Sequence, residues 1–262
     1  MTKGESLTSA KNPLLREVRR AVVRGTLTED GCAVAEGFHL LEEALRSECR
    51  VKAVLVASSV KTAVEGHVGG LQGVKVHEVE DTLFAALSTT EATQGVLALV
   101  RPPAWTLEQL FRGRSLVVVL DGVQDPGNAG TVVRAAEAFG ATGVLFVKGS
   151  VNPYHPKTLR ASAGSIFRVP LVAGVDGALA RAALEQHRLD IYAAMPGGSK
   201  SLTEVDLKRR LALIIGSEGR GVSARLRGCA LDLRIPTTGV DSLNAAMAAA
   251  ILLYEARRQR AL

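Results

Sequence analysis

Four short apolar runs in the second half of the chain constrain its fold more than any other feature. They are residues 116–120, 143–147, 191–195 and 211–215. Near-continuous apolar runs of this length are typical of strands that are buried on both faces of a parallel sheet. Helical patterns at residues 131–139 and 178–187 lie between these runs, and such alternation requires crossover connections. The second half therefore predicts an α/β fold, with a mostly parallel sheet and helices on both faces.

A last helix is expected from about residue 242. At helical spacing its apolar side chains form one stripe, made of Leu243, Ala246, Met247, Ala250, Ile251 and Tyr254. The helix ends in a basic segment, where positive charge interacts favourably with the helix dipole.

Pro102 and Pro103 divide the chain, because a pair of prolines continues neither a strand ladder nor a helix. Before them, helices are expected at residues 13–24, 38–46 and 81–87, the last with Asp81 as its N-cap. Strands are expected at residues 32–35, 51–57, 74–79 and 96–100. This pattern predicts a smaller α/β domain at residues 1–100, a linker at 101–114 and a second domain at 115–262.

The charge of the chain suggests a polyanionic partner. The 262 residues have a formal net charge of +6. This charge is +4 in residues 1–24, −4 in residues 25–114 and +6 in residues 115–262. Only 4% of the residues are aromatic, which excludes a broad platform for stacking bases. Hydrophobic residues at 47% and charged residues at 22% are typical of a folded chain and exclude general disorder.

The cysteines and the lack of targeting patterns favour a cytoplasmic protein. Cys32, Cys49 and Cys229 form no Cys-x-x-Cys pair, and residues 1–9 do not have the pattern of a signal peptide. The longest apolar stretch, residues 245–253, is too short to span a membrane. The sequence contains no His-Glu-x-x-His motif and no Cys/His cluster, so no metal site is expected.

Glycine-rich loops follow the apolar runs, at the edge where open α/β sheets bind their ligands. Residues 121–134 and 216–221 follow apolar runs, and a third loop, residues 235–244, precedes the last helix. Glycine lets the main chain approach a ligand closely, so these loops suit a nucleoside-like cofactor. Gly219, Gly221 and Ala224 also match a loose dinucleotide fingerprint, but after the fourth strand rather than the first. A nicotinamide-dependent oxidoreductase is therefore a weak alternative.

These loops resemble the three motifs of the SpoU (TrmH) family of RNA 2′-O-ribose methyltransferases, in the SPOUT superfamily. The segments are DPGNAGTVVRAAEAFG at residues 125–140, IGSEGRG at 215–221, and IP followed by SLNAAM within 235–247. Residues 152–164, with NP and then PKTLRASAG, resemble a further segment of that family. The first half, with AEGFHLLEEA at residues 35–44, resembles the family's N-terminal substrate-binding domain, which is similar to ribosomal RNA-binding proteins.

The resemblance implies an S-adenosylmethionine-dependent enzyme that methylates a ribose 2′-hydroxyl in structured RNA. It also implies a chain threaded into a deep trefoil knot, and a homodimer with cofactor sites beside the interface. A full N-terminal domain favours 23S-type ribosomal RNA, and hence a part in rRNA processing. A tRNA 2′-O-ribose methyltransferase and a catalytically inactive RNA-binding relative stay as alternatives.

Matched residue by residue, the implied catalytic set is Asn128, Arg134, Glu218, Ser242 and Asn244. Arg134 corresponds to the family's proposed base; because arginine stays protonated in proteins, holding a phosphate or orienting the hydroxyl is the alternative role. Glu218 is expected to orient Asn128, Arg134 or a loop backbone. The structural alternatives are a surface ion pair for Arg134, a turn or cap for Asn128, and the N-cap of the last helix for Ser242.

Two groups of binding residues are also expected, all from the resemblance except Arg16, Arg19 and Arg20, which are proposed from their charge. The cofactor residues are Ala194, Met195, Gly197, Gly216, Glu218, Gly219, Ile235, Ser242 and Leu243. The RNA-binding residues are Lys157, Arg160, Ser162, Arg16, Arg19 and Arg20. Strand-end geometry and core packing are the alternative for the first group, and a solvated charged face is the alternative for the second.

Overall fold

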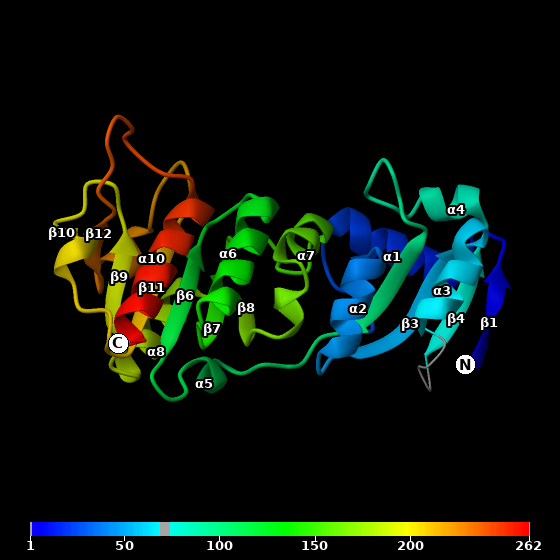
Figure 1. The fold of residues 1–262 in the computed structure, drawn as a ribbon, viewed down its shortest axis with the longest axis horizontal. Coiled ribbons are helices and arrows are strands. Elements are labelled where there is room, and N and C mark those ends of the chain that lie inside the picture. Colours follow the sequence, from blue (N-terminus) through cyan, green and yellow to red (C-terminus); the bar gives the residue numbers. More distant parts are fainter. Residues whose placement is uncertain (1, 69–73, 262) are drawn as a thin grey trace. The chain divides into compact units, whose positions relative to one another are not determined.

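Two separate stretches of the chain form the first of two structural units. The computed structural model describes residues 2–68 and 74–261 (Figure 1). The first unit comprises Met1–Pro103 and Tyr154–Phe167, and the second comprises Ala104–Pro153 and Arg168–Leu262. Residues 154–167, expected within the second domain, thus pack with the first unit. The functional division at residues 1–100, 101–114 and 115–262 stays a prediction.

The first unit is built on a five-stranded mixed sheet with the order β1-β4-β3-β5-β2. Its strands are β1 (Thr2–Leu7), β2 (Ala33–Glu36), β3 (Arg50–Ala57), β4 (Lys75–Val79) and β5 (Val96–Arg101). Its helices are α1 (Pro13–Arg24), α2 (Phe38–Arg46), α3 (Lys61–Val68), α4 (Asp81–Ala85) and α7 (Pro156–Ser162), with 3-10 turns η1 (Ser58–Val60) and η2 (Ser165–Phe167). Leu15 and Val18 of α1 share one core with Leu55 of β3 and Leu97 of β5. This unit is the small α/β domain that the first half predicts.

The second unit contains a seven-stranded sheet with the order β10-β12-β9-β11-β6-β7-β8. Its strands are β6 (Leu116–Asp121), β7 (Gly143–Val147), β8 (Leu171–Val175), β9 (Asp190–Ala194), β10 (Lys200–Ser201), β11 (Leu211–Gly216) and β12 (Leu231–Arg234). Every neighbouring pair is parallel. The helices are α5 (Leu107–Leu110), α6 (Pro126–Ala138), α8 (Gly177–Gln186), α9 (Ala224–Arg227) and α10 (Ala245–Arg260), with the 3-10 turn η3 (Leu202–Glu204).

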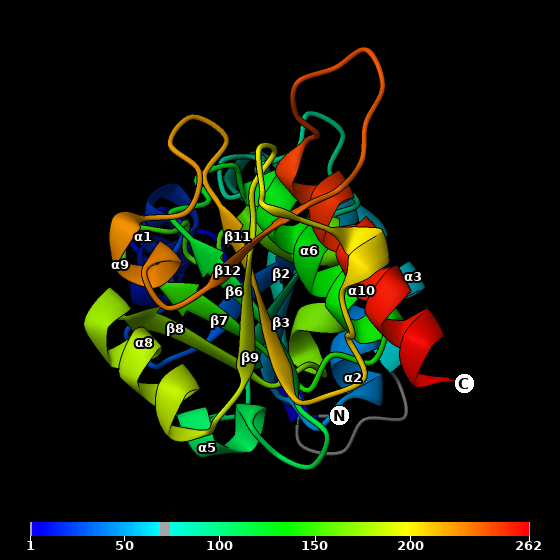
Figure 2. The ribbon, with the colours of Figure 1, turned by 90° about the vertical axis from the view of Figure 1, so that its left-hand side faces the viewer.

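Helices cover both faces of this sheet (Figure 2). On one face, Leu184 of α8 and Leu226 of α9 pack in a core with Val117, Val119 and Ile214 of the strands. On the other face, α6 and α10 pack against each other, α6 also contacts β7, and α10 contacts β11. The predicted α/β fold with a mostly parallel sheet is confirmed. Within the described ranges, no helix combines the length and the apolar character that crossing a membrane requires.

Two helices begin at other residues than expected, and a third has another N-cap. α6 begins at Pro126 with Asp125 as its N-cap, not at residue 131, and proline is well suited to a first helical position. α4 has Glu80 at its N-cap position, so Asp81 is the first helical residue and accepts a hydrogen bond from the Ser59 hydroxyl instead. α10 begins at Ala245 rather than near residue 242.

Most of the apolar stripe expected on the last helix does not face the sheet. Met247, Ile251 and Tyr254 are 56%, 37% and 55% exposed. The buried face consists instead of Ala245, Ala246, Ala249, Leu252, Leu253 and Ala256. The first ten residues of α10 are almost all apolar, so helical spacing alone does not define which side faces the sheet.

Candidate functional site

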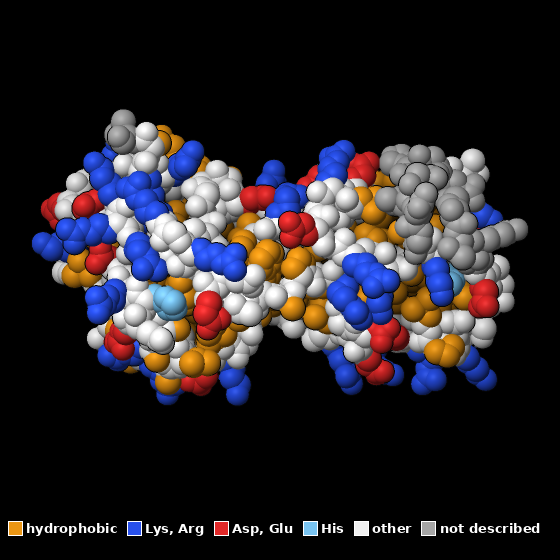
Figure 3. Space-filling model, turned by 90° about the horizontal axis from the view of Figure 1, so that it is seen from below, with side chains coloured by type: hydrophobic (Ala, Val, Ile, Leu, Met, Phe, Trp, Pro, Cys, Tyr) orange, Lys and Arg blue, Asp and Glu red, His pale blue; other side chains and the backbone are white. Residues whose placement is uncertain are grey.

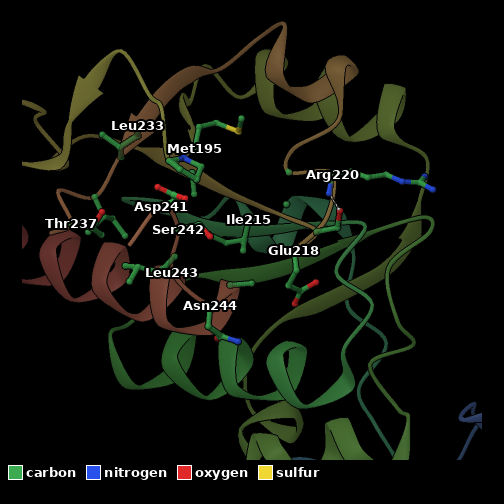
Figure 4. Close-up of a pocket in the computed structure, with 18 residues that line it drawn as sticks. Met195, Ile215, Glu218, Arg220, Leu233, Thr237, Asp241, Ser242, Leu243 and Asn244 are labelled. Carbon is green, nitrogen blue, oxygen red and sulfur yellow. Dashed lines mark hydrogen bonds between the residues drawn. The ribbon is translucent and has the colours of Figure 1, made fainter. Parts of the chain in front are cut away.

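A pocket of about 610 Å³ lies at the carboxyl edge of the seven-stranded sheet (Figure 4). Its walls come from the ends of β9, β11 and β12 and from the segment that leads into α10. The apolar lining includes Met195, Ile215, Leu233, Ile235 and Leu243, and the polar lining includes Glu218, Asp241, Ser242 and Asn244. The pocket therefore offers an apolar wall together with hydrogen-bonding groups, as sites for nucleoside-like ligands do.

The loop after β11 folds back tightly to form one wall. Ser217 N donates to Gly221 O at 3.1 Å, and Gly221 N donates to Ser217 O at 2.9 Å. A Cβ atom on Gly216 would lie 2.1 Å from the carbonyl carbon of Gly221, which itself has a φ of +67°. The buried Asp121 at the end of β6 accepts a hydrogen bond from Ser223 N at 2.7 Å and fixes the end of the loop. Glycine at positions 216 and 221 is thus a requirement of this backbone path.

A chain of hydrogen bonds joins three polar side chains at this edge. Asn128 Nδ2 donates to Glu218 Oε1 at 2.5 Å, and Asn244 Nδ2 donates to Asn128 Oδ1 at 3.0 Å. Because a carboxylate only accepts, it fixes the orientation of the Asn128 amide, which in turn fixes that of Asn244. The structure therefore brings together three of the five residues expected to be catalytic. Of the partners expected for Glu218, it selects Asn128.

Two residues of this hydrogen-bonded series, Asn128 and Asn244, lie at helix N-termini. Asp125 Oδ1 accepts a hydrogen bond from Asn128 N at 2.7 Å, so Asn128 belongs to the first turn of α6 and not to a loop. Asn244 Oδ1 accepts hydrogen bonds from Ala246 N at 2.9 Å and Met247 N at 3.3 Å. The N-cap of α10 is therefore Asn244 rather than Ser242. Asn244 uses its oxygen to cap the helix and its nitrogen to hold Asn128.

Most of the expected cofactor residues line this pocket. Ala194, Met195, Gly216, Glu218, Ile235, Ser242 and Leu243 do so, whereas Gly197 and Gly219 are not among its lining residues. Sequence reasoning missed Ser217, Arg220, Leu233, Thr237 and Asp241. Most of these residues lie within residues 215–221 and 235–247, which contain the recognised motifs. Their position there could have indicated that they line the pocket. Figure 4 shows the Arg220 side chain directed away from the other labelled residues.

Arg134 lies outside the pocket lining. It is exposed on α6, six residues from Asn128 and therefore about 9 Å further along the helix axis. Among the described residues, its guanidinium has no hydrogen-bond or ion-pair partner. The surface ion pair considered for Arg134 is thus not formed.

The residues expected to contact RNA lie in the first unit. Lys157, Arg16 and Arg19 are exposed. Arg20 forms an ion pair with Glu29. Ser162 is fully buried, and its hydroxyl donates to the carbonyl oxygen of the residue three positions earlier, so this hydroxyl does not face solvent.

Arg160 belongs to a polar cluster that ties α7 to the end of β2. Its guanidinium donates to Thr89 Oγ1 at 2.6 Å and lies 3.6 Å from the Glu36 carboxylate. Burial alone would raise the pKa of Glu36, but hydrogen bonds from Ser88, Thr90 and Thr89 bring its pKa below the usual value. Glu36 is therefore held as a buried carboxylate beside Arg160, which gives Arg160 a structural role.

A parallel α/β sheet with glycine-rich loops around a pocket at its carboxyl edge is typical of proteins that bind a nucleoside-like cofactor. Comparison with known families identifies the family within this class. The model of the SpoU rRNA Methylase family matches residues 115–254, and that of the MRM3-like substrate binding domain matches residues 12–98. The chain belongs to the SpoU rRNA methylase family.

Three known proteins illustrate the similarity. The 23S rRNA (guanosine(2553)-2'-O)-methyltransferase RlmP of Bacillus subtilis (strain 168) is 32% identical over 260 residues, which cover 97% of this chain and 99% of RlmP. The SpoU methyltransferase AviRb from Streptomyces viridochromogenes, in complex with AdoMet, is 28% identical with a TM-score of 0.86, over 96% of this chain and 99% of AviRb. A structure described as giving insights into the 2-OH methylation of C/U34 on tRNA is 32% identical with a TM-score of 0.51, over 56% of this chain and 96% of that one.

Proposed function

We propose that this protein methylates the 2′-hydroxyl of a ribose in 23S-type ribosomal RNA. Membership of the SpoU family defines the enzyme class, an RNA 2′-O-methyltransferase, and its cofactor, S-adenosylmethionine. The observation that supports this activity in the chain itself is the hydrogen-bonded series Glu218–Asn128–Asn244 at the edge of the pocket.

The pocket suits S-adenosylmethionine. Leu233, Ile235 and Leu243 offer an apolar surface for a purine ring, and the main chain of the loop after β11 offers donors and acceptors for polar groups. The close approach of Gly216 to Gly221 leaves no room for a side chain, so the wall is built from backbone at this point. When bound, the cofactor supplies an activated methyl group on a positively charged sulfur.

The chain's own residues position the reacting hydroxyl. Asn128 has both ends of its amide engaged, and Asn244 is fixed by the cap of α10, so this polar group is held in a single arrangement. Arg134 is a cation without a partner among the described residues, and it binds the phosphate beside the target ribose or orients its 2′-hydroxyl. Alignment of this kind accelerates a reaction by removing the entropic cost of bringing the groups together.

Ribosomal RNA is favoured over tRNA by the extent of the similarities. RlmP, a 23S rRNA enzyme by its name, is similar over 97% of this chain. The structure concerned with tRNA methylation covers only 56% of the chain. The additional match, residues 12–98, is to a substrate-binding domain. A tRNA substrate is the alternative.

Labelled methyl from S-adenosylmethionine should enter 23S rRNA from an unmodified source, and mapping should place it on one ribose. Separated tRNA and 16S rRNA serve as controls in the same assay. Label in tRNA alone would replace the ribosomal assignment with the alternative. Cofactor binding without label in any free RNA would move the test to partly assembled ribosomal subunits, and failure there too would contradict the proposed function.

The homodimer expected from the resemblance is supported by the outer face of α10. Met247, Ile251 and Tyr254 follow each other at helical spacing and are exposed. Tyr254 also makes an edge contact with Phe139 at the end of α6, with ring centroids 5.8 Å apart. An exposed apolar stripe of this kind is typical of a protein interface.

The double variant Met247→Glu/Ile251→Glu should convert the dimer into a monomer. Two carboxylates buried in an apolar contact would lack partners, and the desolvation cost would exceed the energy of a typical contact. Sedimentation velocity at micromolar concentration measures the change. Leu179→Glu, at an exposed position of α8 on the other face of the sheet, is the matched control. A wild-type protein that sediments as a monomer would disprove the dimer.

The trefoil knot and the cytoplasmic location also belong to this proposal. The knot is supported by the path of the last segment, which leaves β12 near one edge of the sheet, lines the pocket beside the loop after β11, and reaches α6 through α10. Cytoplasmic location is supported by Cys32, Cys49 and Cys229, which are free thiols in the described residues.

A further inference from the structure

Basic side chains gather at the amino edge of the seven-stranded sheet, opposite the pocket. Three segments meet there: residues 112–115 before β6, residues 208–210 before β11, and the end of α10 at residues 257–260. Figure 3 shows Lys and Arg side chains spread over this end of the second unit. We call the exposed Arg112, Arg114, Lys208, Arg209 and Arg257 the basic edge.

The main chain of the three segments is held together by one arginine. Arg260 donates to the carbonyl oxygens of Leu207 at 2.9 Å, Arg114 at 3.1 Å, Ser115 at 3.0 Å and Arg209 at 2.5 Å. Burial, with a further contribution from the nearby Arg114, lowers the pKa of Arg260 to about 10. The hydrogen bonds of Arg260 therefore fix the backbone under the basic edge. They form although the guanidinium groups of Arg260 and Arg114 repel each other.

Several cations elsewhere on the second unit are paired with carboxylates, unlike those of the basic edge. Arg168, Arg181, Arg225 and Arg227 each form an ion pair with a carboxylate. In the part of the chain that the structure describes, the side chains of Arg112, Lys208, Arg209 and Arg257 have no such partner, and Arg114 donates only to carbonyl oxygens.

The three segments themselves contain no acidic residue, and two lie just outside them. Glu255 is paired with Arg258, and the Asp206 carboxylate accepts a hydrogen bond from Lys208 N. The helix dipole favours the basic residues at the end of α10 but gives no reason for those before β6 and β11. Unpaired exposed cations on a fixed backbone are what phosphate groups bind.

We propose that the basic edge binds the phosphate backbone of the RNA substrate at a place remote from the target ribose. This inference rests on the proposed function, because it takes RNA as the polyanion. The six residues of β11 run from this edge to the pocket and span about 20 Å. One RNA molecule therefore contacts both the basic edge and the pocket only if it extends around the second unit. Such contacts add affinity without reading sequence.

The test removes four charges of the basic edge together. The variant Arg112→Ala/Lys208→Ala/Arg209→Ala/Arg257→Ala should weaken binding of a 23S rRNA transcript by about 10- to 100-fold at physiological salt. The slope of log affinity against log salt should fall by about 3, as expected for four lost phosphate contacts. The rate of methyl transfer at saturating RNA and the affinity for S-adenosylmethionine should stay unchanged, because all four residues are remote from the pocket.

A variant with the same charge change elsewhere is the matched control. Arg168→Ala/Arg181→Ala/Arg225→Ala/Arg227→Ala also removes four charges, and it should bind the transcript nearly as the wild type does. An equal loss of RNA affinity in both variants would show that only the net charge of the protein matters, and it would overturn the proposal. An unchanged salt slope in the basic-edge variant would overturn it as well. Tighter binding of polyglutamate than of RNA would instead assign the edge to an acidic protein.

Binding is measured without cofactor, which separates this proposal from the proposed function. RNA binding that depends on the basic edge, in a protein that transfers no methyl group, would leave the present inference standing and contradict only the catalytic assignment.

Discussion

Replacing Arg134 by alanine should abolish methyl transfer while cofactor binding stays largely intact. The side chain is exposed, lies outside the pocket lining and has no partner among the described residues, so its loss disturbs neither the fold nor the cofactor site. A positioned positive charge next to the reacting ribose acts mainly in the transition state, and its removal should lower kcat/KM by at least about 100-fold. Single-turnover transfer to 23S rRNA, together with calorimetric titration of S-adenosylmethionine, measures both quantities.

Arg168→Ala is the matched control for this variant. Arg168 forms an ion pair with Glu137, which lies on α6 together with Arg134. The change therefore also removes a cation beside α6 but leaves Arg134 in place. Its activity should stay within about threefold of the wild type, since an exposed ion pair contributes little. Arg134→Lys tests the role itself: a phosphate contact tolerates a point charge in part, whereas forked recognition does not. Equal loss of transfer and of cofactor binding in folded Arg134→Ala would contradict the assignment.

Several elements with a strong hydrophobic pattern were predicted, although β8 (Leu171–Val175), itself an apolar run, was not. α1 at Pro13–Arg24 and β7 at Gly143–Val147 coincide with their predictions, because an amphipathic stripe and a buried apolar run are strong local signals. β12, with the alternating sequence LDLR, and the two-residue β10 are too short to give a strong local signal, and they owe their pairing to neighbours distant in sequence. The start of α6 could have been found, since Asp125 followed by Pro126 is a cap followed by a favoured first position.

Many residues that line the pocket were named from the sequence, but their arrangement was not predictable. The glycine loops and their polar residues stand out in the sequence, whereas the contact of Asn128 with Glu218 spans 90 positions and depends on β11 lying beside β6. Nothing local indicates that residues 154–167 pack with the first unit, where Ser162 becomes buried. Nor does helical spacing reveal the inward face of α10, because small and large apolar residues surround its first turns.

The variant Asn244→Asp should separate the two functions of Asn244. Aspartate caps a helix as well as asparagine does and suits the positive end of the dipole, so α10 should keep its cap and the thermal midpoint should hardly change. The Nδ2 donor to Asn128 Oδ1 is lost, however, and a carboxylate oxygen comes to face that carbonyl oxygen. The amide of Asn128 then loses its fixed orientation toward Glu218. We expect kcat for methyl transfer to fall about 10- to 100-fold, with a small change in KM for S-adenosylmethionine.

Asn244→Ala provides the comparison, because it removes the cap as well as the donor. It should lose activity to a similar degree and also destabilise the protein by about 1 kcal/mol, the usual effect of removing an N-cap. Asp176→Asn makes the reverse exchange at the N-cap of α8, on the other face of the sheet, and should leave kcat unchanged. Wild-type kcat in Asn244→Asp would show that the Asn128–Asn244 hydrogen bond is structural. Loss of stability in Asn244→Asp equal to that in Asn244→Ala would instead trace the effect on activity to the helix cap.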